Sequence, residues 1–535
     1  MATKRSIAGI AGIVAAATLL SKVFGYLRQA TILAAFGTGP VSDAFVAAYV
    51  VPDFLLVLLG GVNGPFHSAI VSAISKRDKR EAAPIIETVT TITGLFFLAV
   101  TILLIIFAPP IIDTFVPGLR ETEVGAAITR PIAILLLRIM APITIFASLI
   151  GIGFGSLNAD DQYWLPSVSP MISSVVVVIG LSVLRVILGD RISDPAYFII
   201  GGITIASCTL LGSIFQWLAQ LPALTKSGLA SLRLRFDVQN QGVRDVLGVL
   251  LPAALSSGTL KINTIVDLRF ASFIPDSIAA LDAASLLVAL PLGIISSLVL
   301  VPYFPIFARL SEPAQWPELK RRIRQCLMLI SLTMLPISAL TMVLAQPAVT
   351  VVYRRGAFDN NSVEIVAWLM MAYGSGLFVY LARDIMVRVF YALGDGTTPF
   401  RISAVNIILN VILDYILVQS LGVAGLILAT IIVNISSILT MIILLDRQLG
   451  GLPLLEWTGA IFTVFVASFA SGVVAWFAKS GLANWVGVET FSANLIVMSL
   501  AGVAGIAAFA ILTTAVLKIP ETEILTQRIQ QKIGR

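Results

Sequence analysis

Histidine, cysteine and charged residues are all scarce in this chain of 535 residues. His67 is the only histidine, so a zinc site or a proton relay built from several histidines is excluded. The two isolated cysteines, Cys208 and Cys326, indicate no disulfide framework. The sequence has no P-loop, the Gly-rich phosphate-binding motif that ends in Lys and then Ser or Thr, so ATP hydrolysis within the chain is not expected. These absences argue against a membrane-embedded enzyme.

Apolar residues dominate the composition. Hydrophobic residues make up 58% and charged residues only 12%, whereas a soluble domain has about 25% charged residues. Runs of roughly 20 apolar residues, each long enough to cross a hydrocarbon core of about 30 Å, recur along the whole chain. The sequence therefore predicts an all-α polytopic membrane protein with about fourteen transmembrane helices. The apolar runs lie near residues 8–34, 41–74, 84–112, 127–157, 163–187, 197–224, 242–273, 277–308, 321–345, 362–393, 399–419, 421–446, 456–478 and 492–517.

Lysine and arginine gather in alternate loops between these runs. They are concentrated in segments 4–5, 75–80, 226–244 and 320–324, at Arg447 and in the tail from Lys518, and are sparse in the loops between. The positive-inside rule then predicts that both termini are cytoplasmic. The net charge of +6 is accounted for by these loops, and no basic patch interleaved with aromatic residues suggests a nucleic-acid partner.

Three landmarks occur twice, at a separation of about 236 to 239 residues. An Asp-Ala pair followed by proline, a second proline in an apolar run, and a Gly-rich segment with an aromatic residue all recur. The pairs are Asp43-Ala44 and Pro52 with Asp282-Ala283 and Pro291, Pro110 with Pro347, and segment 153–166 with segment 388–400.

This repeat predicts the organisation of the chain. The separation spans six predicted crossings, an even number, so the two copies have the same orientation in the membrane and are parallel repeats. We expect a six-helix lobe over residues 1–224, a second over 225–450, and two extra helices with a cytoplasmic tail over 451–535. Such repeats are typical of secondary transporters, in which the substrate path runs between the halves.

Charged residues inside the apolar runs indicate where a substrate would bind. Each costs at least about 2.5 kcal/mol to bury in a membrane, so it usually faces a cavity or a partner. Equivalent runs of the two lobes carry such charges, which together would line a cationic cavity suited to a phosphate or pyrophosphate head group. The alternative is internal pairing, of Arg28 with Asp43 or of Asp267 with Arg269, that holds helices in register. The candidate substrate-binding residues are Lys22, Arg28, Asp43, Lys261, Arg269 and Asp282.

A second polar cluster lies in the eleventh run. Asn406, Asn410 and Asp414 recur every four residues, which places them on one helical face, and Thr430 lies in the next run. Carboxylate, carboxamide and hydroxyl oxygens at membrane depth are suitable ligands for a monovalent cation, and Asp267 is a plausible further carboxylate. An interhelical hydrogen-bond ladder explains the same spacing equally well.

A break in the second run is also expected. Gly60-Gly61 and Asn63-Gly64-Pro65 interrupt it, which predicts a bend. His67 follows at once, and we interpret it as a packed or interfacial residue rather than a proton relay.

Three segments resemble a known family. SKVFGYLRQATILAAFGTGPVSDAF at 21–45, RRGAF at 354–358 and FYALGDGTTPFRI at 390–402 are similar to the lipid II flippases, the MurJ/MviN family of the multidrug/oligosaccharidyl-lipid/polysaccharide exporter superfamily. The resemblance implies a V-shaped pair of six-helix lobes, two extra helices with a groove for a lipid tail, and alternating access. It also implies the transport of an undecaprenyl-pyrophosphate-linked peptidoglycan precursor across the inner membrane of a bacterium.

The resemblance assigns roles to several residues. Arg28 and Asp43 match the important arginine and aspartate of the family, and Lys22 stands where an arginine is usual. Asn410, Asp414 and Thr430 match the ligands of a sodium site, with Asp267 as its seventh-helix ligand. The resemblance implies no organic cofactor, and the ion that it implies is sodium. The implied partners are the lipid-linked anionic glycan, membrane lipids and the cell-wall synthesis machinery.

The chain also departs from the family pattern. Segment 52–66 lacks the family's pair of arginines and its EGA motif, and segment 282–291 lacks the eighth-helix arginine. Lys261 and Arg269, from the neighbouring helix, are our candidates to replace the lost cations. The loss leaves open a flippase for another polyprenyl-linked oligosaccharide or exopolysaccharide precursor.

Overall fold

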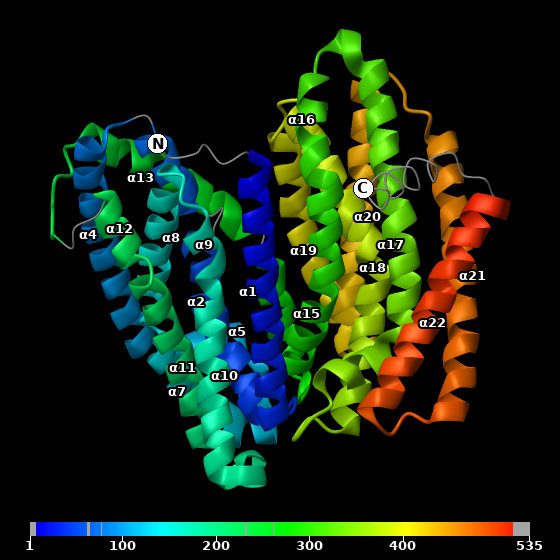
Figure 1. The fold of residues 1–535 in the computed structure, drawn as a ribbon, viewed down its shortest axis with the longest axis horizontal. Helices are drawn as coiled ribbons and strands as arrows, with labels where there is room; N and C mark the ends of the chain where they lie inside the picture. The colour runs from blue at the N-terminus through cyan, green and yellow to red at the C-terminus, as the bar shows by residue number, and fades with distance from the viewer. Residues whose placement is uncertain (1–6, 61–64, 76, 230–232, 260–261, 517–535) are drawn as a thin grey trace. The chain divides into compact units, whose positions relative to one another are not determined.

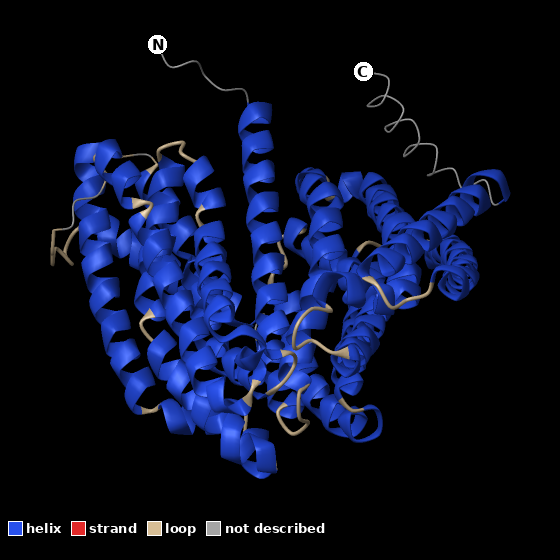
Figure 2. Cartoon of the chain, turned by 60° about the horizontal axis from the view of Figure 1, so that its bottom comes forward, coloured by secondary structure: helices blue, strands red, loops and turns tan. Residues whose placement is uncertain are grey.

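The structure is a computed structural model that describes residues 7–60, 65–75, 77–229, 233–259 and 262–516. Every regular element in these ranges is a helix, and they contain no strand (Figure 2). Ten helices among them are long and apolar enough to cross a membrane, and the pair Gly125–Met140 with Ile143–Ala159 passes the same test with a bend of 43°. The chain is therefore an all-α, multi-pass membrane protein, as the sequence predicts.

Each of the predicted apolar runs corresponds to helix where the structure describes it. Eleven runs correspond to the ten long helices and the one bent pair, which leaves the runs 8–34, 41–74 and 242–273. The run 8–34 corresponds to α1 (Ile7–Phe36). The run 41–74 corresponds to α2 (Pro40–Gly60) with α3 (Pro65–Ile74), and the run 242–273 to α13 (Gln241–Thr259) with α14 (Ile262–Ala271). The predicted break falls on residues 61–64, which lie outside the described residues; α2 is described to Gly60 and α3 from Pro65. The exact count of fourteen crossings stays a prediction.

Packing divides the chain into two compact units (Figure 1). Unit 1 consists of Met1–Ala279 with Arg355–Phe358, and unit 2 of Ala280–Arg354 with Asp359–Arg535. The predicted lobe boundary at 224/225 differs from this division, because α13 packs on α2, α3 and α4, and α14 packs on α5 and α6. The boundaries derived from the repeat stay a prediction about equivalent segments rather than about packing.

Unit 1 contains α1 to α14 and the first turn of α15. Besides those already given, its helices are α4 (Lys79–Ile106), α5 (Ala108–Phe115), α6 (Gly118–Glu121), α7 (Arg130–Met140), α8 (Ile143–Ala159), α9 (Trp164–Val168), α10 (Pro170–Leu188), α11 (Phe198–Leu218) and α12 (Leu221–Ser227).

Unit 2 contains the rest of α15 and all later helices. They are α15 (Ser277–Ile295), α16 (Val301–Arg309), α17 (Trp316–Tyr353), α18 (Asn360–Ala392), α19 (Thr397–Leu421), α20 (Val423–Gln448), α21 (Leu454–Val486) and α22 (Phe491–Ile511). The repeat landmarks Pro52 and Pro291 both lie inside helices, α2 and α15 respectively.

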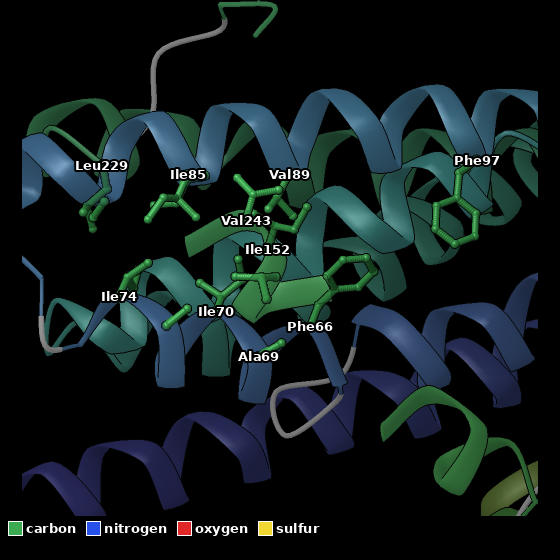
Figure 3. Packing of buried hydrophobic residues seen from close by; sticks show 14 residues of the cluster. Phe66, Ala69, Ile70, Ile74, Ile85, Val89, Phe97, Ile152, Leu229 and Val243 are labelled. Carbon is green, nitrogen blue, oxygen red and sulfur yellow. The ribbon is translucent and has the colours of Figure 1, made fainter. Parts of the chain in front are cut away.

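An apolar core joins four helices of unit 1. Phe66 and Ile70 of α3, Ile85 of α4, Ile152 of α8 and Val243 of α13 are buried together (Figure 3). Without a hydrophobic force between helices in lipid, close approach depends on small residues. Gly155 shows this: a Cβ there would lie 2.8 Å from the Cβ of Ile70, so only glycine lets α8 pack this closely on α3.

The segment Arg355–Phe358 follows α17 in the sequence but belongs to unit 1, and it packs on the C-terminal end of α1. Ala357 N–H donates to the carbonyl of Ala34 at 2.9 Å. Gly356 has φ +58, and a Cβ there would lie 2.2 Å from the Ala34 oxygen. The glycine of the RRGAF motif is thus required both for its backbone conformation and for this contact.

The two C-terminal helices pack on α17. Val464 of α21 is buried against Met328, Leu332 and Leu335 of α17. Ser471 Oγ of α21 donates to the carbonyl of Gly505 in α22 at 2.7 Å, which joins the two extra helices to each other.

Candidate functional site

Arg28 is the charged residue of α1 that lies deepest in the fold. Its Nε atom is buried and has no hydrogen-bond partner among the described residues, whereas Lys22 on the same helix is exposed. Arg28 forms no ion pair with Asp43 in the described part of the chain, so the pairing offered as its alternative role is not observed. An arginine nitrogen without a partner in an apolar helix is available to a ligand that accepts hydrogen bonds.

Asp43 lies in the first turn of α2 and is 4% exposed. Its Oδ1 atom accepts a hydrogen bond of 2.7 Å from the N–H of Ala279, in the first turn of α15. The first N–H groups of a helix lack partners in the helix and carry a partial positive charge, so a carboxylate there is stabilised on both counts. The structure therefore places this predicted substrate residue at a helix end.

Arg269 is also bonded to the backbone. Its Nη1 atom donates to the carbonyl of Thr114, in the last turn of α5, where a cation complements the helix dipole. Nearby, Gly118 N–H donates to Ser272 Oγ at 3.0 Å. These bonds fasten α14 to α5 and α6. Lys261, the other proposed replacement for the family's arginines, lies outside the described residues.

The two remaining acidic candidates are partly buried. Asp267 lies on α14 in unit 1, and Asp282 lies on α15 in unit 2. Their predicted contributions, to the sodium site and to the head-group site respectively, stay predictions.

Helix α19 is polar on the side that it buries. Its buried residues are Pro399, Asn406, Asn410 and Asp414, while its large apolar side chains, such as Ile408 and Ile412, are exposed. In a membrane this pattern turns the apolar face to lipid and the polar face to the neighbouring helix. The spacing of four residues predicts this shared face correctly.

Three oxygens on α19 and α20 are buried and have no hydrogen-bond partner among the described residues. Asn410 Nδ2 donates to Asp414 Oδ1 at 3.1 Å, which leaves Asn410 Oδ1 and Asp414 Oδ2 without a donor, and Thr430 Oγ1 is in the same state. Helices α19 and α20 pack against each other. A complete hydrogen-bond ladder would satisfy these atoms, and each orphan costs about 1–3 kcal/mol.

The donor set fits a sodium ion. A carboxylate, a carboxamide and a hydroxyl oxygen, all buried, are hard ligands with little negative charge, which suits a monovalent cation. No group of three or more His, Cys, Asp or Glu side chains in the described ranges could hold a metal ion, which disfavours a transition-metal or calcium site there.

Two further polar residues lie in the described helices, of which the sequence analysis considered His67 but not Lys479. His67 bonds Asn158 Nδ2 through its Nε2 atom at 2.8 Å, which joins α3 to α8 and fits a packed residue. Lys479 is a half-buried cation in α21, a helix whose only other charged residue is Glu456 near its start. A lone lysine within an apolar run is the sequence signal that could have identified it.

Comparisons with known proteins agree with this architecture. The family model described as "Lipid II flippase MurJ" matches residues 32–497. A protein of Synechocystis sp. named "Probable lipid II flippase MurJ" is 47% identical over 543 aligned residues, which cover 100% of this chain and 99% of that protein.

Solved structures give the same fold. A structure titled "Lipid II flippase MurJ, inward closed conformation" matches with a TM-score of 0.75 at 23% identity, over 94% of this chain and 99% of that one. An inward-facing multidrug resistance MATE transporter of the MOP superfamily matches with a TM-score of 0.64 at 18% identity, over 80% of this chain and 94% of that one. On the strength of the family model and the 47% identical relative, this chain belongs to the lipid II flippase MurJ family.

Proposed function

We propose that the chain is a lipid II flippase, which moves an undecaprenyl-pyrophosphate-linked peptidoglycan precursor from the inner to the outer leaflet of a bacterial inner membrane by alternating access. Family membership supports the substrate class. The single structural observation that carries the proposal is the buried, unpartnered guanidinium nitrogen of Arg28 in a membrane helix. A planar guanidinium matches the oxygens of a pyrophosphate with two parallel hydrogen bonds.

The proposal requires no covalent chemistry from the protein. Transport needs a site that binds the head group more tightly in one conformation than in the other, because a ligand shifts an equilibrium only by its differential affinity. Asp43 supplies a contact that can differ between conformations, since it joins α2 to the start of α15. In this function both termini are cytoplasmic, as the distribution of Lys and Arg predicts, and the cell-wall synthesis machinery receives the product.

Sodium binding at α19 and α20 is part of the proposal. Asn410, Asp414 and Thr430 would hold the ion through the three orphaned oxygens, and Asp267 is the proposed fourth ligand. A bound cation would supply the charge that offsets the carboxylate of Asp414. The protein residues would then fix α19 against α20 and favour the conformation in which all the ligands meet.

A flippase for another polyprenyl-linked glycan is the second candidate. The absence of the family's arginine pair from segment 52–66 and of its eighth-helix arginine from segment 282–291 favours this candidate, because fewer cations line the predicted cavity.

Complementation separates the two candidates. Cells depleted of their own lipid II flippase should grow when they express this chain, and should accumulate lipid II in the inner leaflet when they do not. Growth failure by cells that contain the full-length chain in their membrane would contradict lipid II transport and favour the other glycan. A matched strain that expresses the Arg28→Ala variant controls for the effect of membrane-protein expression alone.

A further inference from the structure

Lys479 satisfies a backbone group that a proline leaves open. Its Nζ atom donates to the carbonyl of Val343 in α17 at 3.0 Å. Residue 347, four positions on, is a proline inside the helix, and proline has no N–H to donate to that carbonyl. In lipid an unsatisfied carbonyl is costly, so the lysine has a clear structural role.

Unit 1 satisfies a similar gap without a buried charge. The carbonyl of Ile105 lies four residues before Pro109 and accepts a hydrogen bond of 3.3 Å from Arg138 Nε. Arg138 is exposed, whereas Lys479 is half-buried. A backbone carbonyl needs only a donor, so this structural role alone does not explain why the donor at Val343 is a half-buried ammonium.

The charge of Lys479 has no carboxylate partner in the part of the chain that the structure describes. Among the described residues, no acidic side chain makes an ion pair with its Nζ atom, and the bond to Val343 uses one of three ammonium donors. A cation at this depth that is neither paired nor exposed usually faces a cavity or a ligand.

A cavity of about 270 Å³ lies beside Lys479 in unit 2. Gln346, Thr350 and Arg354 of the α17 segment and Asn494 of α22 also line it, and the exposed carboxylates Glu364 and Glu489 contribute to its wall. Arg354 Nη1 donates to the Glu489 carbonyl at 3.3 Å, which leaves its other guanidinium donors available. Figure 1 shows the α17–α18 and α21–α22 loops at the same end of unit 2.

We propose that this cavity binds the phosphate head group of a lipid in the outer leaflet. Lys479 and Arg354 would contact the phosphate oxygens, because charge-assisted bonds from ammonium and guanidinium to phosphate are strong. Glu364 and Glu489 would face the hydroxyl, amide or ammonium groups attached to the phosphate. The volume is below the roughly 300–1,000 Å³ of a drug-sized pocket, so it suits a head group rather than a whole glycan.

Two lipids carry this chemistry in that leaflet. One is the flipped polyprenyl-pyrophosphate product and the other is an anionic phospholipid. The assignment to the outer leaflet rests on the proposed function and its topology. The binding of a phosphate head group to the cavity does not depend on that function. A failure of transport and a failure of this site are therefore distinguishable by measuring binding to the purified protein.

The experiment measures binding to the full chain in detergent by native mass spectrometry. The probes are undecaprenyl pyrophosphate, phosphatidylglycerol and inorganic pyrophosphate. Lys479→Gln retains a donor for the Val343 carbonyl and removes the charge, so we expect at least one of the two lipids to bind about tenfold more weakly, the loss expected for one charge-assisted bond. Arg354→Gln should act in the same direction. The control is Arg447→Gln, which removes an exposed charge at the far end of α20.

A proline variant separates the structural role from binding. Pro347→Ala supplies a backbone N–H that can donate to the Val343 carbonyl. The double variant Lys479→Met with Pro347→Ala should therefore melt near the wild-type temperature while still binding lipid weakly. Wild-type lipid affinity in Lys479→Gln and in this double variant would overturn the proposal and leave Lys479 as a donor to one carbonyl. Binding of inorganic pyrophosphate but of neither lipid would overturn it as well. A larger loss for undecaprenyl pyrophosphate identifies the product as the ligand, and a larger loss for phosphatidylglycerol identifies the phospholipid.

Discussion

The charged residues of unit 1 and the oxygens on α19 and α20 of unit 2 differ in how completely the fold satisfies them. Asp43 accepts a backbone N–H, and Arg269 donates to a backbone carbonyl, each at a helix end. On α19, by contrast, the one side-chain bond from Asn410 to Asp414 leaves an oxygen on each residue without a donor. The same sequence signal, a polar residue in an apolar run, therefore marks two kinds of position.

The difference separates residues whose polar groups are satisfied within the fold from residues with a buried polar atom that a ligand could satisfy. A polar side chain bonded to a helix end already gains from burial, because it and the helix end satisfy each other. A buried atom without a partner costs free energy until something binds it. By this criterion Arg28, although it lies in unit 1, belongs with Asn410 and Asp414 rather than with Asp43 and Arg269.

The largest effect is expected at Arg28. Arg28→Ala should abolish flipping of labelled lipid II in proteoliposomes, and Arg28→Lys should be strongly impaired, because an ammonium cannot reproduce the two parallel bonds of a guanidinium. Both variants should insert normally, since Arg28 Nε has no hydrogen-bond partner among the described residues. Arg191→Ala, at an exposed arginine, is the matched control. Wild-type flipping by a well-inserted Arg28→Ala protein would remove Arg28 from the site.

The next effect concerns the orphaned oxygens. Sodium should raise the melting temperature of the purified protein more than potassium does. At a sodium concentration of one hundred times the dissociation constant, the stabilisation free energy should be about 2.7 kcal/mol. Asp414→Ala and Asn410→Ala should erase the difference between the two ions. Asn406→Ala is a close control, because Asn406 is buried on the same face one turn away and has no orphaned atom. Equal melting in sodium and potassium would mean that these oxygens serve helix packing alone.

How much of this comparison could be predicted from the sequence depends on the range of each interaction. The shared face of Asn406, Asn410 and Asp414 follows from helical geometry, because residues four apart lie on one side. The partners of Arg269 and Lys479 do not, since Thr114 and Val343 lie 155 and 136 residues away. No local pattern identifies a carbonyl that accepts from such a distance, even where Pro347 marks the carbonyl as free.

A moderate effect is expected at Asp43, where the fold supplies the partner. Asp43→Ala loses the acceptor for Ala279 N–H and should lower the free energy of unfolding by about 0.5–2 kcal/mol, the range for loss of a helix N-cap. Asp43→Asn keeps an acceptor oxygen and should lose less. Thermal unfolding of the three proteins in one detergent measures the order. An Asn variant that melts like the wild type but no longer flips lipid would move Asp43 from the structural group to the ligand-binding group.

The smallest effect is expected at Asp113, which lies between the predicted runs 84–112 and 127–157, where water competes with the protein for its charge. Arg130 donates to Asp113 through Nε at 2.7 Å and Nη2 at 3.0 Å, and this bonding holds the pKa of the Asp113 carboxyl below its usual value. A lowered pKa stabilises the fold above the unfolded-state pKa of about 3.9, and the gain is lost as the pH falls through the folded-state value. Because the carboxyl is only partly shielded from solvent, Asp113→Asn should cost at most about 1 kcal/mol at neutral pH. Its melting temperature should converge with that of the wild type as the buffer is acidified below about pH 4.

Asp190→Asn, at an exposed aspartate, controls for the change of charge. A deficit at Asp113→Asn that stays constant with pH would show that the side chain contributes through its shape and not through its charge, and would place it beside neither of the two groups compared above.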